Sequence, residues 1–185
     1  MNKGLSEKLI KVYPGLIPKE ISTLETINIK NDNFLSGFSD AEGCFECVIR
    51  KHPTVKIGYQ VAVRFTLAQH LRDFMLIQVI KDHFKCGMVR KDLKKPYVTW
   101  VVVDIIDIVN IIIPFFDNYP LLGNKLSDYE YFRKIAFLGF SEYGSPPPLF
   151  GGATTRPKTQ KVKNKHHLTQ DGFNEIIDLK SKMKR

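Results

Sequence analysis

Cysteine is scarce in this sequence: only Cys44, Cys47 and Cys86 occur among 185 residues. An odd number of cysteines argues against a complete disulfide framework. The spacing Cys44-x-x-Cys47 invites a metal or redox site, but residues three apart in a strand lie on opposite faces. A zinc site also needs about four ligands, and no second pair of cysteines supplies them. We therefore expect no metal bound through cysteine.

Long apolar runs are missing as well. The longest, IIIPFF, contains Pro114 and follows Asp104 and Asp107. It falls far short of the roughly 20 residues that cross a bilayer. The first residues, MNKGLSEKLIKVYPGLIPKE, include acids and lack a long apolar stretch. They predict neither a secretory signal nor an Arg-rich, acid-poor transit peptide, and no membrane partner is expected.

Acidic residues are few relative to basic ones. The chain has 28 lysines and arginines against 19 aspartates and glutamates, which gives a formal net charge of +9. Such an excess favours a polyanionic partner, nucleic acid before an anionic membrane surface. A basic globular protein without such a partner is the plainer alternative. The length is sufficient for one domain with its own core.

What the sequence does contain is an alternation of helical and strand-like apolar periods. Helical spacing covers residues 71–84, 104–116 and 128–140, and period two covers 45–52, 57–67, 88–93 and 97–103. This order predicts an α+β fold in which two hairpins form a four-stranded antiparallel sheet. Helices would cover one face of that sheet, and the other face would be polar and basic.

The chain divides by composition into four segments. Residues 1–33 predict a short helix and a linker-like connector, and residues 34–140 predict the core domain. Residues 141–165 are rich in Pro, Gly, Thr and Lys and predict an exposed loop, inserted into the domain. Residues 166–185 predict a C-terminal helix of the same domain.

The stretch FLSGFSDAEGCF, residues 34–45, reads as a short helix rich in small residues that ends in Asp40 and Glu42. Acids at a helix C-terminus oppose the macrodipole, so helix stability does not explain them. The residues from Leu35 to Gly43 resemble the LAGLIDADG signature of homing endonucleases. The segments PLLGNK, residues 120–125, and NKHHLTQDGFNEIIDLK, residues 164–180, are similar to further segments of that family.

The resemblance implies a LAGLIDADG homing-endonuclease-like αββαββα fold, whose motif helices pack in pairs. GLSEKLIKVYPGLIP resembles the interdomain stretch of two-motif members, so the chain resembles the C-terminal half of such an enzyme. A second motif is then expected from an identical chain or from a separate N-terminal half. Close helix approach needs small side chains. The expected helix-pair interface comprises Ser36, Gly37, Asp40 and Ala41, with Asp40 in a more structural role.

By position in the motif, the resemblance implies that Glu42 is the catalytic metal ligand and that Mg²⁺ is the cofactor. Divalent ions polarise a phosphodiester and lower the pKa of an attacking water. The resemblance also implies that Gln69 orders water and that Lys125 stabilises developing phosphate charge. A polar strand end and a solvated lysine are the ordinary alternatives for these two residues.

Double-stranded DNA is the expected partner of the sheet's polar face, for which a solvated surface is the plainer alternative. Arg and Gln can address guanine and adenine edges in the major groove, and apolar side chains can contact thymine methyl groups. The expected base-reading positions are Glu46, Val48, Arg50, Gln60, Arg64, Thr66, Arg90 and Thr99. The lysines expected to contact phosphates, which position without specifying sequence, are Lys91, Lys94 and Lys95.

Three functions remain open at this point. The first is a site-specific double-strand DNA homing endonuclease that promotes intron mobility by metal-dependent phosphodiester hydrolysis. The second is a maturase that binds intron RNA and assists splicing, which would not require the Glu42 carboxylate. The third is a catalytically inactive DNA-binding remnant. Since such reading frames are common in organellar introns, the resemblance implies a mitochondrial location, with the chloroplast as the alternative.

Overall fold

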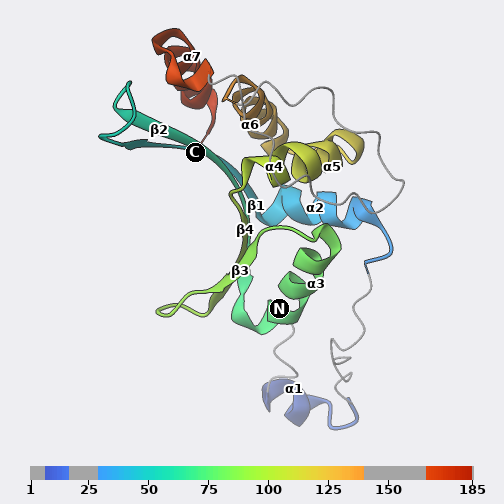
Figure 1. Ribbon diagram of the computed structural model, residues 1–185. Helices are drawn as coiled ribbons and strands as arrows, with labels where there is room; N and C mark the ends of the chain where they lie inside the picture. Colours follow the sequence, from blue (N-terminus) through green and yellow to red (C-terminus); the bar gives the residue numbers. More distant parts are fainter. Residues whose placement is uncertain (1–6, 17–28, 140–165, 185) are drawn as a thin grey trace.

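The computed structural model of this chain describes residues 7–16, 29–139 and 166–184 (Figure 1). Its helices and strands alternate in the predicted α+β order. In chain order they are α1 (Glu7–Val12), α2 (Asp32–Glu42), β1 (Gly43–Lys51), β2 (Tyr59–His70), η2 (Leu71–Asp73), α3 (Phe74–Phe84), β3 (Met88–Lys91), β4 (Tyr97–Val102), α4 (Ile105–Asp107), η3 (Ile108–Ile112), α5 (Ile113–Asn118), α6 (Lys125–Gly139), η4 (His166–Leu168) and α7 (Gln170–Lys182).

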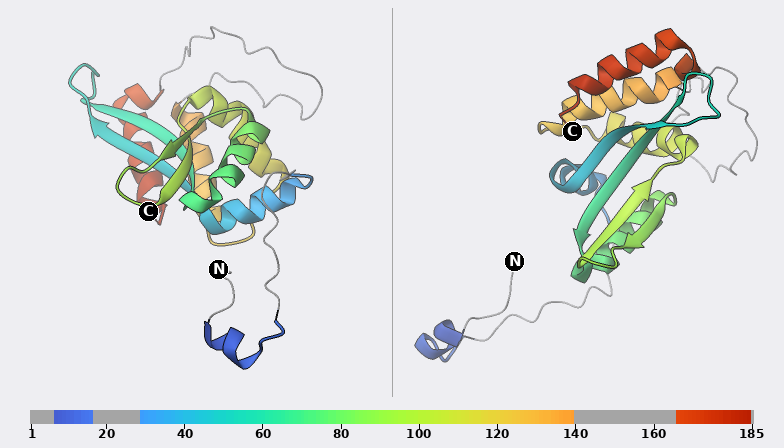
Figure 2. Two further views of the ribbon diagram at one scale, coloured as in Figure 1. Left: turned by 90° about the horizontal axis from the view of Figure 1, so that it is seen from below. Right: turned by 90° about the vertical axis from the view of Figure 1, so that its left-hand side faces the viewer.

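The four strands form one antiparallel sheet in the order β1-β2-β4-β3. Gly43 pairs with Leu67 at one end of the β1–β2 ladder, and Lys51 pairs with Tyr59 at the other. The sheet is curved, with helices packed against one face and its concave face open (Figure 1). Helices α6 and α7 lie side by side in Figure 2. The predicted four-stranded antiparallel sheet, covered by helices on one side, is confirmed.

Side chains alternate across the sheet as the period-two runs require. Phe45 of β1, Phe65 of β2 and Trp100 of β4 are buried against the helices. Cys47 also lies in this core, whereas Cys44 is partly exposed on the opposite face. Burial raises the pKa of the Cys47 thiol to about 11. The two cysteines therefore point apart, as expected from their spacing.

An aromatic cluster packs β1 against the helices α5 and α6. The ring of Phe45 lies 4.9 Å from that of Phe65, 5.2 Å from Phe116, and 5.3 Å from both Tyr129 and Phe132. Such offset and edge-to-face pairs add to the area that these rings bury. The start of β1, directly after the motif helix, is thereby held rigidly.

Two predicted boundaries change. The motif helix begins at Asp32, two residues before the predicted start, because the Asn31 side chain caps it by accepting the N–H of Asn33 at 2.9 Å. The apolar stretch 104–116 is not one α-helix but α4, the π-helix η3 and α5. Pro114 contributes to this break because it has no N–H to donate to the preceding turn. The predicted loop 141–165 lies outside the described residues.

Of the helices in the parts of the chain that the structure describes, none combines the length and apolar character needed to cross a bilayer.

Gly87, at the entry to β3, offers a test of the core packing. Its φ is +69°, and a Cβ there would lie 2.6 Å from the Val101 carbonyl oxygen and 2.7 Å from Trp100 Nε1. We expect Gly87→Ala to lower the free energy of unfolding by about 2–4 kcal/mol, through strain and overpacking. Gly58→Ala is the control, because φ is +74° but a Cβ would contact nothing, and backbone strain alone costs about 1 kcal/mol. Equal losses in urea titrations would contradict the packing argument.

Candidate active site and nucleic-acid interface

The loop before α6 holds the C-terminal end of the motif helix α2. The Asp40 carboxylate accepts the backbone N–H groups of Leu122 at 3.0 Å and of Gly123 at 2.6 Å. A Cβ at Gly123 would lie 2.7 Å from Asp40 Oδ1, so a larger residue would crowd this contact. The Lys125 ammonium donates to the Ala41 carbonyl at 2.5 Å. The PLLGNK segment is therefore hydrogen-bonded to the end of α2, where the two acids lie.

The contacts with residues 122–125 offset part of the unfavourable negative charge at the C-terminal end of α2. The last turn of α2 contains no basic residue, and its acids face the negative end of the helix dipole. Lys125 supplies a cation at that end from 84 residues along the chain. The Asp40 charge is offset by two N–H groups, whereas no hydrogen bond or ion pair to a described residue holds the Glu42 carboxylate, which is exposed.

The junction between α2 and β1 fixes the position of Glu42. Gly43 donates its N–H to the Ser39 carbonyl and enters the strand directly. A Cβ at Gly43 would lie 2.5 Å from that carbonyl oxygen, so only glycine fits without a shift. Glu42 thus sits at a rigid point where the half-buried helix α2 meets a strand of the sheet.

The other two predicted catalytic residues lie around the same helix end. Gly43, at the end of α2, pairs with Leu67 of β2. Gln69 lies two residues after Leu67 on the same strand. Its side-chain oxygen lies 3.4 Å from the backbone nitrogen of His70. Lys125 lines a small hollow at the start of β1 together with Gly43, Cys44, Phe45 and Asp128.

Asp128 is a residue of this site that sequence reasoning missed. It lies one turn after Lys125 on α6 and lines the same hollow. Its carboxylate accepts the backbone N–H of Lys184 at 2.9 Å, so the chain just after α7 arrives beside the site. The spacing of three from Lys125 was a signal that could have found it.

The small residues of α2 divide between two sides of the helix. Ser36 is 5% exposed and donates its hydroxyl to the Tyr119 carbonyl at 2.8 Å and to the Pro120 carbonyl at 3.2 Å. The Ser36 hydroxyl is therefore bonded within the chain, and its contact with a second motif helix stays a prediction. A Cβ at Gly37 would meet nothing within 4 Å, and Ala41 is exposed.

The open side of α2 also carries aromatic surface. The Phe34 side chain is 50% exposed and stacks on Phe38 with ring centroids 5.8 Å apart. Gly37 and Ala41 are one turn apart on this side. We name the surface formed by Phe34, Gly37, Phe38 and Ala41 the open motif face.

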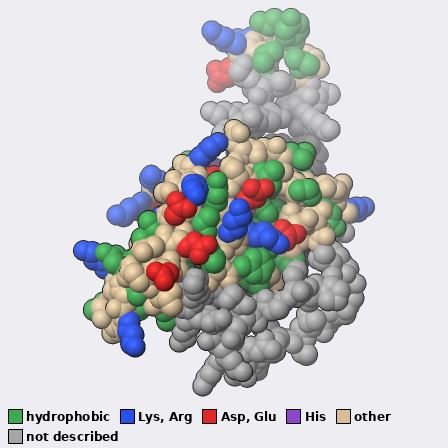
Figure 3. All heavy atoms as spheres, turned by 90° about the horizontal axis from the view of Figure 1, so that it is seen from above, with side chains coloured by type: hydrophobic (Ala, Val, Ile, Leu, Met, Phe, Trp, Pro, Cys, Tyr) green, Lys and Arg blue, Asp and Glu red, His purple; other side chains and the backbone are tan. Residues whose placement is uncertain are grey.

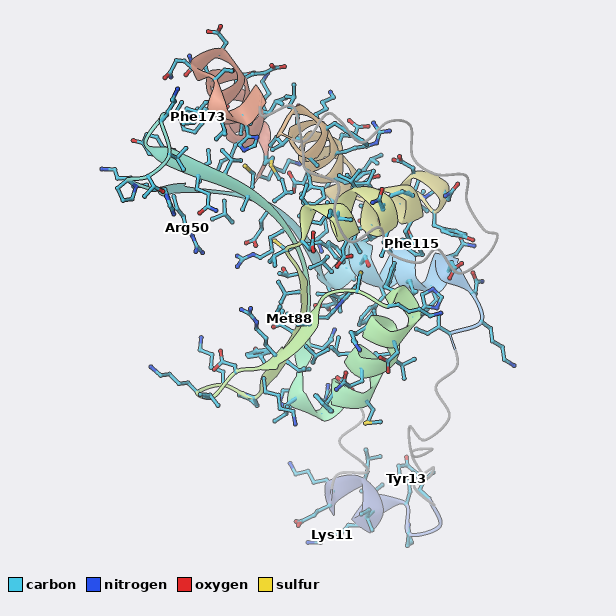
Figure 4. All side chains as sticks on the ribbon, in the orientation of Figure 1. Lys11, Tyr13, Arg50, Met88, Phe115 and Phe173 are labelled. Carbon is cyan, nitrogen blue, oxygen red and sulfur yellow. The ribbon has the colours of Figure 1, made fainter. Side chains whose placement is uncertain are left out.

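The predicted base-reading side chains all come from the concave face of the sheet. The strand register places Glu46 opposite Arg64, Arg50 opposite Gln60, and Arg90 opposite Thr99. Arg50 of β1 and Met88 of β3 mark two parts of this face in Figure 4. The remaining members, Val48 and Thr66, alternate with buried neighbours on β1 and β2.

The three predicted phosphate-contacting lysines differ in their surroundings. The Lys91 ammonium lies 4.0 Å from the centroid of the Phe74 ring, so it is directed toward α3. Lys94 and Lys95 are exposed in the β3–β4 turn, where both backbone N–H groups bond to Asp92 Oδ1 at 2.7 and 3.0 Å. These bonds, that of Lys94 first, lower the pKa of the Asp92 carboxyl.

The end of the molecule that carries α6 and α7 is electrostatically different. Acidic and basic side chains are interspersed there in Figure 3. Lys182 pairs with Asp178 at 2.6 Å, and Arg133 with Asp117 at 3.1 Å. Such mixed surfaces attract a polyanion less than a face with few acids.

Residues 35–136 match the family model described as LAGLIDADG endonuclease. The chain belongs to the LAGLIDADG endonuclease family. It is 30% identical to "Probable intron-encoded endonuclease 2" of Neurospora crassa, over 99% of this chain and 36% of that protein. It is 33% identical to "Probable intron-encoded endonuclease 3" of the same fungus, over 95% of this chain and 29% of that protein.

Solved LAGLIDADG structures resemble the whole chain. The structure of I-SmaMI bound to uncleaved DNA target in the presence of calcium ions has a TM-score of 0.78 and 32% identity. It covers 100% of this chain and 55% of that one. I-LtrWI bound to target DNA gives 0.75 and 33% identity, over 99% of this chain and 53% of that one. The chain thus spans about a third of the length of the curated relatives and about half of the length of these endonucleases.

The donor set of the LAGLIDADG motif suits a hard divalent cation. The exposed Glu42 carboxylate offers oxygen ligands, and Mg²⁺ prefers one or two carboxylates completed by waters and substrate phosphates. In residues 7–16, 29–139 and 166–184, no group of three or more His, Cys, Asp or Glu side chains gathers as a metal cage. The Glu42 carboxylate at the end of α2 can offer one ligand of this kind.

Proposed function

We propose that this chain forms one half of a site-specific, metal-dependent DNA endonuclease that hydrolyses phosphodiester bonds. The observation that carries the proposal is the Glu42 carboxylate, which is exposed and unpaired by described residues at the rigid junction of α2 and β1. The same junction starts the first strand of a curved sheet whose concave face holds arginine, glutamine and threonine side chains. Cutting and sequence reading would thus share one scaffold.

Each proposed catalytic residue has a distinct task. Glu42 would hold Mg²⁺, which when bound polarises the scissile phosphodiester and lowers the pKa of an attacking water. Lys125, already fixed beside the Ala41 carbonyl, supplies positive charge where negative charge develops on the phosphate. Gln69 offers an amide that can both donate to and accept from an attacking water.

Cleavage of both DNA strands requires a second motif, because this chain carries one Glu42. The open motif face is suited to a second motif helix, since glycine and alanine permit close approach. Its source would be a second copy of this chain or a separate N-terminal half. The half-length match to solved endonucleases supports this arrangement.

The relatives named intron-encoded suggest the same biological role for this chain. We propose that cleavage promotes the mobility of a host intron in a mitochondrial genome. The maturase and inactive-remnant hypotheses remain predictions of the sequence, and a cleavage assay separates them from the endonuclease.

The test of this function uses the purified chain and a randomised duplex DNA library. Bound duplexes are selected and sequenced, and the enriched sequence is placed in a plasmid and incubated with Mg²⁺. We expect one long sequence family to be enriched, and the plasmid to be cut with Mg²⁺ but not with EDTA: linear plasmid if two copies of the chain assemble, nicked plasmid if the second motif must come from a separate half. Specific binding without any cut in either strand would favour the remnant, and absence of specific binding would refute the proposal.

Lys94 should contribute affinity without contributing sequence preference. Its exposed ammonium in the β3–β4 turn can displace one counterion from a phosphate. We expect Lys94→Ala to weaken binding to all duplexes alike, and to reduce the slope of log K against log salt by about 0.9. Lys134→Ala is the matched control, because Lys134 is exposed on α6, which packs on the helix-covered side of the sheet and not on its concave face. Sequence-dependent loss in Lys94→Ala would contradict the phosphate assignment.

A further inference from the structure

An ion pair joins the first two strands on the concave face of the sheet. Glu46 of β1 and Arg64 of β2 are Cα partners in the ladder, and Arg64 Nε donates to Glu46 Oε2 at 2.6 Å. The two side chains are 31% and 37% exposed. This contact joins two positions that the sequence had suggested separately as base readers.

Folding stability gives little reason for this pair. Exposed ion pairs contribute almost nothing to stability, because water and salt screen them and two long side chains lose freedom. Glu46 is also the single carboxylate among the positions of the four described strands that face the concave side of the sheet. A carboxylate there repels the phosphates of the proposed DNA ligand.

The pair leaves a particular set of hydrogen-bonding groups free. Arginine has five N–H donors, and only the one on Nε is used by Glu46. The donors on both terminal nitrogens of Arg64 and one oxygen of Glu46 have no partner among the described residues. The protein therefore presents donors from β2 directly beside an acceptor from β1.

One base pair presents the complementary pattern in the major groove. Guanine offers the N7 and O6 acceptors, to which arginine binds with two N–H groups, and cytosine offers the N4 amino donor beside them, which a carboxylate accepts. A reversed C·G pair would set the amino group against the arginine and the acceptors against the carboxylate. An A·T pair places an amino donor between its acceptors and matches the protein less well.

The residue pairs that flank Glu46 and Arg64 on β1 and β2 carry no charge. Val48 and Ala62 pair on one side of it, and their side chains can contact a thymine methyl group but cannot donate or accept. Cys44 and Thr66 pair on the other side. No other charged side chain thus shares these adjacent rows of the two strands.

We propose that Glu46 and Arg64 together read a single G·C base pair in one orientation, with Arg64 on guanine and Glu46 on cytosine. In this arrangement Glu46 also positions Arg64, since a free arginine could swing to a phosphate or another base. The inference rests on the proposed function, because it specifies what one part of the DNA-binding face recognises.

A charge swap tests the proposal directly. The wild-type chain, Glu46→Gln, Arg64→Gln and the double variant Glu46→Arg/Arg64→Glu are assayed for binding to the selected duplex and to all of its single base-pair variants. At one position the wild type should prefer G·C by about 10- to 100-fold. Glu46→Gln should bind duplexes of every sequence somewhat more tightly while losing most of that preference. The swap exchanges donors and acceptors across the two strands, so its preference should invert to C·G at the same position.

Arg90→Gln is the matched control, because this arginine lies on β3 in contact with Met88. It should alter preference elsewhere in the site and leave the G·C position unchanged. If the swap and both single variants keep the wild-type preference at every position, the inference is refuted while sequence-specific binding stands. If the wild type shows no sequence preference, the proposed function fails and this inference fails with it. Should the swap not fold, the two single variants decide the question by themselves.

Discussion

Glu42→Gln should abolish cleavage of the selected plasmid while leaving the duplex bound. The amide keeps the size of the side chain but removes the charged oxygen ligand at the end of α2. Metal-assisted polarisation supplies several kcal/mol of transition-state stabilisation, so we expect the rate to fall by about a thousandfold or more. Stability should change in the opposite direction: removing an acid from the negative end of a helix should raise the free energy of unfolding by about 0.3–1 kcal/mol. Plasmid cleavage, fluorescence anisotropy and thermal melting measure the three effects.

Two controls separate catalysis from architecture in this prediction. Glu42→Asp retains a carboxylate and should keep measurable cleavage. Asp40→Asn should act differently, because Asp40 bonds the N–H groups of Leu122 and Gly123 instead of facing solvent. It should cost about 1 kcal/mol of stability and impair cleavage only through the displaced loop. If Glu42→Gln cuts as fast as the wild type, Glu42 is not the metal ligand.

The strands and their outward residues were predictable because the alternation of apolar and polar residues indicates both the strand and the face to which each side chain points. Period two in residues 57–67 separates Val63 and Phe65 from Arg64 and Thr66 without knowledge of any partner strand. The structure confirms this division. The ion pair between Glu46 and Arg64 was not predictable in the same way, because it depends on the β1–β2 register. A hairpin with several residues in its loop leaves that register open.

The two sides of α2 show what helical spacing leaves undecided. Ser36 and Asp40 are four residues apart, and so are Gly37 and Ala41, so each pair forms its own stripe on the helix. All four residues are small or polar, and the sequence alone does not say which stripe is covered. Bonds to the loop at residues 119–123 decide it, and those contacts span more than 80 residues. Of the four predicted interface residues, Gly37 and Ala41 are therefore on the exposed stripe.

Gly37→Leu should prevent assembly of a cutting complex without harming the chain that carries it. A Cβ at Gly37 meets nothing within 4 Å, and replacing glycine inside a helix should stabilise the chain by up to about 1 kcal/mol. The same side chain would separate two helices that pack through the open motif face. Overpacking of about 3 kcal/mol would weaken their association by about 100-fold. The melting temperature should therefore stay level or rise while double-strand cleavage is lost.

Light scattering of the chain with its selected duplex distinguishes this outcome from a folding defect. The wild type should form a complex with two motifs per duplex, either two copies of this chain or one copy with an added N-terminal half, and Gly37→Leu should leave one. Glu130→Leu adds the same side chain at an exposed position of α6 and should leave assembly intact, since that residue is not on the open motif face. A wild-type chain that cuts both strands as a strict monomer on DNA would contradict the paired-helix proposal. Loss of assembly together with a lowered melting temperature would instead place Gly37 in the core of its own domain, against the empty space around it.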